Sequence, residues 1–233
     1  MSKEIIVKLS DGSDVCKIEF TKEFKNRTVT SSKIIKLDDF IKSLMETNSV
    51  VEDTIIPQNL AMIKKSGKKT YYFFDFPSQK KHITVLNRSY KPIFDDMAWV
   101  PRTIFVIVPD IATGKIRGKD MLVYAAKGTE QLKPDTQLYH LPMYNIFPRD
   151  AICWGSYHYD FGDVNSLDKC TSVHSRMYEA SCNLDLQPIY DAEWAYDNIP
   201  KYRTNSSFIE VLRFLKDEDK FPEGLLVPTN RII

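Results

Sequence analysis

Regularly spaced apolar runs between residues 59 and 126 constrain this fold more than any other feature of the sequence. Each run has the length of a strand, and segments rich in Gly, Pro, Ser or Lys separate the runs. Such spacing is typical of an antiparallel meander. We assign the intervening segment KPIFDD, residues 91–96, to a turn. The sequence therefore predicts strands at residues 59–64, 69–76, 81–87, 102–108 and 120–126.

A second pattern of short elements precedes this series. Residues 4–9 and 15–20 are apolar runs on either side of the segment SDGSD, and an Asp-Gly pair between such runs predicts a β-hairpin. Residues 27–35 predict a third strand. Over about 36–47 the apolar residues recur with the period of an amphipathic helix.

The C-terminal half is less regular. Residues 128–190 are mostly irregular but rich in aromatic residues, which favours an ordered, functional loop region. A short helix is predicted within 168–182. A last helix begins near Ser207, because Ser207 and Glu210 have the spacing of a capping box before an apolar stripe.

This order of elements predicts an α+β fold, in which helices flank an antiparallel β-meander of four or five strands. We expect residues 1–50 to form an N-terminal extension or a small α/β subdomain, and residues 51–233 to form the main domain. No internal repeat or low-complexity segment interrupts this organisation.

Charge and cysteine content exclude several classes of protein. The net charge is +1 and no run of five like charges occurs, so we expect neither a nucleic acid nor a membrane as partner. The first residues lack the apolar core of a signal peptide, and no apolar stretch approaches the length of a transmembrane helix. The four cysteines form no CxxC pair, which favours a cytoplasmic protein with free thiols.

One pair of residues carries a possible chemistry. Asn145 precedes Cys153 by eight residues, with a Pro-Arg-Asp turn between them. A cysteine thiolate attacks acyl groups, and a neighbouring amide N–H stabilises the tetrahedral oxyanion that forms. By spacing alone this signal is weak, and the better explanation is that Cys153 is a small buried hydrophobe and that Asn145 caps a turn.

The segment PDTQLYHLPMYNIFPRDAICWGS, residues 134–156, resembles the active-site segment of ubiquitin-conjugating enzymes. In that family the nucleophilic Cys lies eight residues after the Asn of a His-Pro-Asn triplet and follows an apolar residue. Cys153, Asn145 and Ile152 stand at these positions. Together with the strings VPRTIFVIVPD and LVYAAKG, the segment is similar to the prokaryotic ubiquitin-conjugating-enzyme-like family D, which includes PRTRC system protein B. The resemblance covers residues 100–156 well and about 60–215 loosely.

This resemblance implies a ubiquitin-conjugating fold and a function in a bacterial conjugation pathway. Cys153 would carry a ubiquitin-like modifier as a thioester received from an activating enzyme, and Asn145 would stabilise the oxyanion. No metal or organic cofactor is implied. Further residues of the loop would shape it or contact the acyl group: Tyr139, His140, Tyr144, Trp154 and Asp160. The triplet is altered here, because Met143 and Tyr144 directly precede Asn145.

Two other functions fit the same residues. The first is a catalytically inactive scaffold that keeps this fold and binds a ubiquitin-like or activating-enzyme partner. The second is a Cys-dependent hydrolase, with Cys153 as nucleophile and His158 or His174 as base.

Neighbouring polar residues have simpler interpretations. Cys170 and His174 lie four residues apart, but a structural zinc site usually needs a second tight pair, so we expect partly exposed histidines in a polar loop. Asp160 and Asp163 flank Gly162 and are expected to be turn residues.

Overall fold

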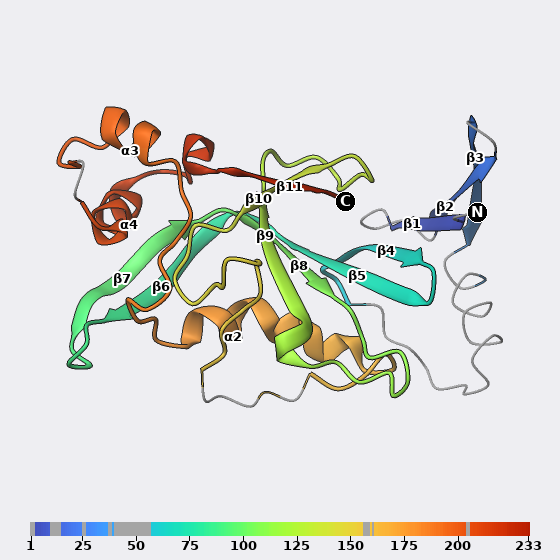
Figure 1. Ribbon diagram of the computed structural model, residues 1–233, viewed down its shortest axis with the longest axis horizontal. Coiled ribbons are helices and arrows are strands. Elements are labelled where there is room, and N and C mark those ends of the chain that lie inside the picture. Colours follow the sequence, from blue (N-terminus) through green and yellow to red (C-terminus); the bar gives the residue numbers. More distant parts are fainter. Residues whose placement is uncertain are drawn as a thin grey trace. The chain divides into compact units, whose positions relative to one another are not determined.

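The computed structural model describes residues 3–9, 15–24, 27–36, 39, 57–155, 159, 161–203 and 206–233. These residues form an α+β fold of antiparallel strands and helices, as the sequence predicts (Figure 1). The chain divides into two compact units: Met1–Phe74 with Val106–Asp120 and Tyr159–Thr171, and Asp75–Phe105 with Met121–His158 and Ser172–Ile233. The predicted domain boundary at residue 50 lies outside the described residues and stays a prediction.

The first unit contains an antiparallel sheet in the order β5-β4-β1-β2-β3. Every strand expected from the sequence in this part is confirmed, including the hairpin in which Val7 pairs with Ile18. The helix predicted for about 36–47 lies outside the described residues, apart from Lys36, which ends a strand, and Asp39. The strands are β1 (Lys3–Leu9), β2 (Val15–Phe24), β3 (Arg27–Lys36), β4 (Leu60–Ser66) and β5 (Lys69–Phe76), whose last two residues belong to the second unit.

The second unit holds an antiparallel sheet in the order β11-β10-β9-β8 and a separate two-stranded sheet of β6 and β7. All six residues of β8 are buried, as expected for the uninterrupted apolar run TIFVI. The strands are β6 (Gln79–Leu86), β7 (Pro92–Val100), β8 (Arg102–Ile107), whose last two residues belong to the first unit, β9 (Met121–Ala126), β10 (Gln137–His140) and β11 (Pro228–Ile232).

The described α-helices are short, and among them only α3 has an N-cap side chain that makes a capping hydrogen bond, that of Asp191. The predicted helix within 168–182 and the last helix are confirmed, although the Ser207 side chain makes no capping hydrogen bond. No described helix is both long enough and apolar enough to cross a membrane. The α-helices are α2 (Val173–Glu179), α3 (Ala192–Asn198) and α4 (Phe208–Asp217), and the 3₁₀ helices are η1 (Gly118–Asp120), η2 (Leu167–Ser172) and η3 (Glu223–Leu225).

Two features contradict the sequence-based expectations, and some elements were not predicted at all. The segment KPIFDD is not a turn, because β7 begins at Pro92, the strand position at which a missing N–H costs least. The β6–β7 hairpin is a sheet of its own, so the five predicted runs are not one continuous meander. The strands β10 and β11, the helix α3 and the 3₁₀ helices η1 and η3 were not predicted either.

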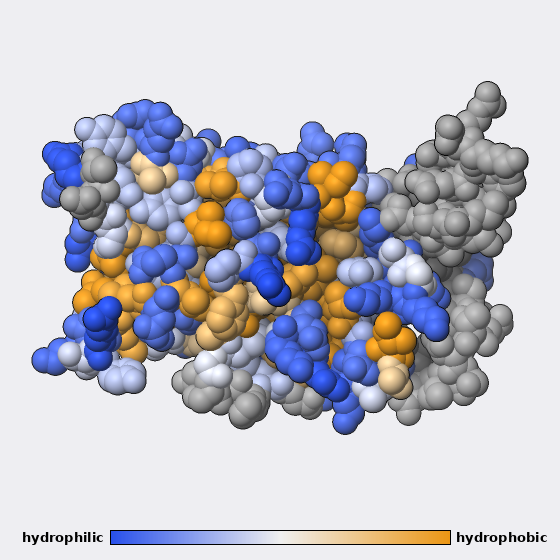
Figure 2. Space-filling model, in the orientation of Figure 1, coloured by the Kyte–Doolittle hydropathy of each residue, from blue (hydrophilic) through white to orange (hydrophobic). Residues whose placement is uncertain are grey.

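The amphipathic helix α4 covers β7 in the second unit. Its buried face carries the predicted apolar stripe of Phe208, Val211, Leu212 and Leu215, and the Trp99 indole of β7 donates a 2.7 Å hydrogen bond to the carbonyl of Glu218, just beyond the helix. In the view of Figure 2, hydrophobic side chains reach the surface in a band over the β6–β7 hairpin. At the tip of that hairpin, Tyr90 is 84% exposed and has a φ of 57°.

Candidate active site

Residues 145–153 form a tight hairpin that brings Asn145 and Cys153 face to face. The backbone N–H of Cys153 donates to the carbonyl of Asn145 at 2.7 Å, and the N–H of Phe147 donates to the carbonyl of Ala151 at 2.9 Å. Ile146 and Ile152 form an antiparallel bridge between these two contacts. The eight-residue spacing is therefore the register of a hairpin, and all of it lies in the second unit.

The turn of this hairpin follows from its sequence. Pro148 supplies a backbone angle suited to the second position of a β-turn, and the N–H of Asp150 donates to the carbonyl of Phe147 at 2.8 Å. Asp150 then adopts a φ of 63°, the left-handed conformation that closes three-residue hairpin loops. The carbonyl of Asp150 also accepts a 2.8 Å hydrogen bond from Val123, which fastens the turn to β9.

Cys153 differs from the other described thiols in its exposure. It is half-buried, whereas Cys170 and Cys182 are buried. Burial raises the pKa of both the Cys170 and Cys182 thiols to about 12, which keeps them protonated at neutral pH. The side chain of Cys16 lies outside what the structure describes. Among the cysteines whose side chains the structure describes, Cys153 is thus the one that is not buried.

The Asn145 side chain is turned toward another segment of the chain. Its Nδ2 atom donates a 3.3 Å hydrogen bond to the carbonyl of Ser181, and its φ of 62° is left-handed. That carbonyl has a fixed position, because the next residue, Cys182, exchanges 2.8 Å backbone hydrogen bonds with Thr84 and Leu86 of β6. The amide nitrogen carries two N–H groups, and this hydrogen bond uses one of them.

The predicted loop-shaping residues lie on both sides of this hairpin. Tyr139 is half-buried in β10, with the Lys127 ammonium 4.8 Å from its ring centroid. Tyr144 is buried, and its ring lies 5.7 Å from that of Phe208 in α4. Burial raises the pKa of Tyr144 to about 12. Trp154 is half-buried directly after Cys153, and Asp160 lies outside the described residues.

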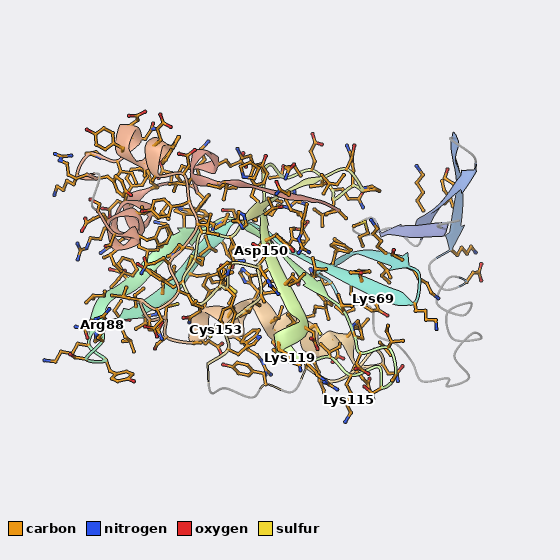
Figure 3. The ribbon with its side chains drawn as sticks, viewed as in Figure 1. Lys69, Arg88, Lys115, Lys119, Asp150 and Cys153 are labelled. Atoms are coloured by element: carbon orange, nitrogen blue, oxygen red, sulfur yellow. The ribbon has the colours of Figure 1, made fainter. Side chains whose placement is uncertain are left out.

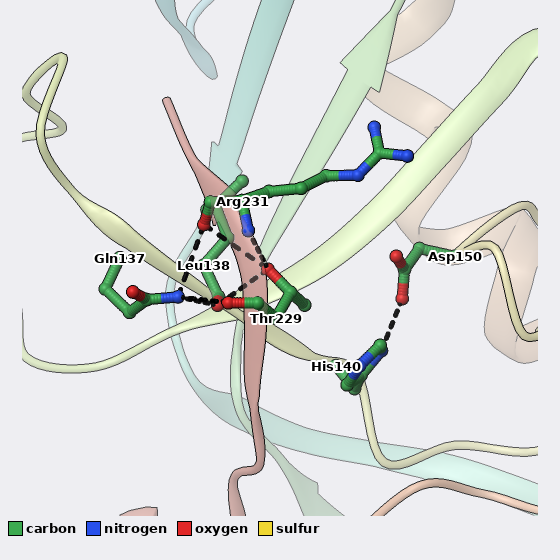
Figure 4. Close-up of polar contacts among 6 residues, drawn as sticks. All are labelled: Gln137, Leu138, His140, Asp150, Thr229 and Arg231. Atoms are coloured by element: carbon green, nitrogen blue, oxygen red, sulfur yellow. Dashed lines mark hydrogen bonds and ion pairs between the residues drawn. The ribbon is translucent and has the colours of Figure 1, made fainter.

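His140 pairs with a residue that the sequence analysis missed. Its Nδ1 atom lies 2.6 Å from Oδ1 of Asp150 (Figure 4), and only 7% of the Asp150 side chain is exposed. The Pro-Arg-Asp turn was visible in the sequence, but its histidine partner ten residues upstream was not.

A shallow crevice, open to solvent, lies next to this pair. His140 and Asp150 form part of its lining, and Ile146, Phe147 and Ile189 contribute apolar walls. Phe147 and Ile189 are 43% and 38% exposed, which is unusual for side chains of their size.

The remaining histidines have structural surroundings. His174 is 2% exposed and its ring stacks on Phe76 at 4.6 Å, so the expectation of a partly exposed histidine in a polar loop is wrong for this residue. Burial, reinforced by the charge of Lys81, lowers the pKa of His174 to about 3. No group of metal-ligating side chains occurs within the described ranges.

A Cys-dependent hydrolase would need a histidine base hydrogen-bonded to the Cys153 sulfur. Nδ1 of His140 is bound to Asp150, and His82 pairs with Asp95. In the part of the chain that the structure describes, no histidine ring is hydrogen-bonded to the Cys153 sulfur, and His158 lies outside that part. Asp163 is a turn residue as expected, because its carboxylate accepts the N–H of Asn165 at 2.8 Å.

Comparison with known proteins places the chain in a family. The family model described as Prokaryotic E2 family D matches residues 36–180, which is more than half of the chain. No curated protein and no solved structure matches it. The match includes the whole hairpin with Asn145 and Cys153, the turn of Asp150 and the strands β8, β9 and β10. The chain therefore belongs to prokaryotic E2 family D and is a ubiquitin-conjugating-enzyme-like protein.

Proposed function

We propose that this protein carries a ubiquitin-like modifier as a thioester on Cys153, in a bacterial conjugation pathway of the kind to which PRTRC system protein B is assigned. The observation that supports this most directly is the hairpin in which half-buried Cys153 lies opposite Asn145. The partners are an activating enzyme, which donates the modifier, and the modifier itself.

The proposed reaction is an exchange of thioesters. The Cys153 thiolate attacks the modifier's terminal carbonyl, a new S–C bond forms, and the S–C bond to the activating enzyme breaks. The departing thiolate takes up the proton that Cys153 released. An acceptor amine then attacks the Cys153 thioester, forms an amide bond, and returns the thiol.

Asn145 is the proposed donor to the oxyanion in both steps. Its amide nitrogen carries two N–H groups, so an acyl oxygen competes with the Ser181 carbonyl only if it approaches on the side of the N–H that Ser181 accepts. The contact is long, at 3.3 Å, so it is weak and readily exchanged. Loss of one oxyanion donor typically slows acyl transfer by about 10²–10³. In this proposal Tyr139, His140 and Tyr144 shape the loop, Trp154 borders the acyl group, and Asp160 assists the acceptor amine.

A charging assay tests this function. The protein is mixed with ATP and with the activating enzyme and modifier from the same source, and the products are separated without reductant. We expect a thiol-sensitive adduct with the wild type, none with Cys153→Ala, and a thiol-resistant ester with Cys153→Ser. Asn145→Asp and Asn145→Gly both tolerate a positive φ and both lack the amide donor, so both should slow charging and discharge.

One observation favours the inactive scaffold as a second candidate. The Asn145 amide points to Ser181 and not to the sulfur. If the activating enzyme charges itself while no adduct forms on this protein, the thioester function is wrong. Binding of the uncharged protein to the modifier or the activating enzyme would then identify the scaffold.

A further inference from the structure

Asp150 occupies a backbone position that normally belongs to glycine. The third residue of such a hairpin loop is left-handed, and glycine adopts that conformation without steric cost. An L-residue there is strained, because its Cβ crowds the backbone. In the described chain, Tyr90, Asn145 and Asp150 are the non-glycine residues with positive φ, and two of these three lie in this one hairpin.

The Asp150 side chain adds a second cost. Arg149, its neighbour in the turn, is exposed, whereas Asp150 is 5% exposed as a residue. Burial of a carboxylate without a hydrogen-bond donor is strongly unfavourable. The donor here is the ring of His140, at 2.6 Å. An exposed aspartate or a glycine would close the same turn, so neither strain nor burial is needed for the turn itself.

Three elements meet at Asp150. Its carboxylate binds His140 at the end of β10, its carbonyl accepts the N–H of Val123 in β9, and its N–H closes the turn. His140 is itself held, because its backbone N–H donates to the carbonyl of Val227 at 3.0 Å. Figure 4 shows the His140–Asp150 contact apart from the neighbouring polar contacts of Gln137, Thr229 and Arg231.

Cys153 lies three residues after Asp150 on the same arm of the hairpin. That arm is extended and bridged, through Ala151 to Leu122 and through Ile152 to Ile146. A displacement of the arm at Asp150 is therefore passed along a stiff segment to the sulfur. Figure 3 labels both residues on their common segment.

We propose that Asp150 is a positioning residue, which holds the Cys153 arm in place through its contact with His140. The effect on thioester transfer rests on the function proposed above. The effect on the position and accessibility of the Cys153 thiol does not.

The test measures the rate at which a neutral haloacetamide alkylates Cys153, at fixed pH and without any partner protein. We expect Asp150→Gly and His140→Ala each to accelerate alkylation on the order of tenfold, because the freed arm exposes the sulfur. The double variant should be no faster than either single variant, since both remove one contact. Asp150→Asn tolerates the positive φ and still accepts from the ring, so its rate should stay within about twofold of the wild type.

Tyr90→Gly is the matched control, because it removes a left-handed side chain at the tip of another hairpin. It should leave alkylation of Cys153 unchanged. If Asp150→Gly reacts at the wild-type rate, or if the two single effects multiply in the double variant, the proposal is wrong. Asp150→Gly keeps the turn conformation, so it carries the test if His140→Ala does not fold. A wild type that reacts as expected but never charges refutes the thioester function and leaves this inference standing.

Discussion

The backbone N–H of Cys153 and the carbonyl of Asn145 lie 2.7 Å apart, which makes the two residues opposite members of one hairpin. Asn145 also has a φ of 62°. Its identity thus affects both the chemistry proposed for the loop and the conformation of the loop, and the two effects have to be separated.

We expect Asn145→Ala to lower the free energy of unfolding by about 1 kcal/mol more than Asn145→Gly does. Both substitutions remove the hydrogen bond to Ser181, so the difference isolates the cost of a positive φ. Urea unfolding at neutral pH measures it. Equal stabilities would mean that the backbone relaxes out of the left-handed region. Asn145→Ala would then serve as well as the glycine variant in the charging assay.

Local patterns predicted much of the fold. The Asp-Gly pair specified the β1–β2 hairpin, and the apolar stripe after Ser207 specified α4. The start of β7 was missed because of Pro92, since a proline within an apolar run is usually a turn signal. The structure shows that Pro92 is the first residue of the strand, where a missing N–H is tolerated. The Asp191 cap of α3, which accepts the N–H of Trp194 at 2.8 Å, was a readable signal that the analysis overlooked.

The candidate site was predictable in part. The spacing of Asn145 and Cys153 is local, and it is now explained by a hairpin register. The contacts of that hairpin are not local. His140 and Ser181 reach it from β10 and from the segment after α2, and no pattern in one sequence specifies which side chain will meet a buried carboxylate.

A second prediction concerns the buried ion pair of Arg102 and Asp75 in the second unit. The Arg102 guanidinium binds both carboxylate oxygens of Asp75, with Nε at 2.9 Å from Oδ1, and also reaches the carbonyl of Gly128. Arg102→Met should lower the free energy of unfolding by roughly 3–5 kcal/mol, because it leaves the largely buried Asp75 carboxylate without its guanidinium.

The double variant Arg102→Met, Asp75→Leu should recover most of this loss, since an apolar pair of similar volume needs no desolvated charge. Chemical denaturation of the four proteins gives the coupling energy. Additive losses would show that the pair contributes little beyond its packing.

A third prediction concerns the selectivity of the thiols. In the folded protein at pH 8, a haloacetamide should modify Cys153 well before Cys170 and Cys182, because those two are buried and burial raises their thiol pKa to about 12. Peptide mapping by mass spectrometry identifies the sites. Addition of urea should remove the difference. Modification of Cys182 at the rate of Cys153 before unfolding would contradict the buried position of Cys182 next to β6.

The last prediction concerns acid stability. Burial lowers the pKa of His174 from 6.5 to about 3, so the folded protein keeps this ring neutral while the unfolded chain protonates it below about pH 6.5. The stabilisation is complete above that pH and is lost as the pH falls toward 3. One pH unit in this window corresponds to roughly 1.4 kcal/mol, so His174 should account for a loss of about 2 kcal/mol between pH 7 and pH 5.

His174→Phe isolates this contribution, because phenylalanine keeps an aromatic ring against Phe76 and cannot take up a proton. Urea unfolding of both proteins at pH 7 and pH 5 gives four free energies. The wild type should lose about 2 kcal/mol more than the variant between the two pH values. Carboxyl groups that gain protons between pH 7 and pH 5 change the stability of both proteins equally, so their contribution cancels when the wild type and the variant are compared. An identical pH dependence would show that the His174 ring gains a proton while the protein stays folded. That outcome would contradict the buried position of its Nε2 atom, which has no hydrogen-bond partner among the described residues.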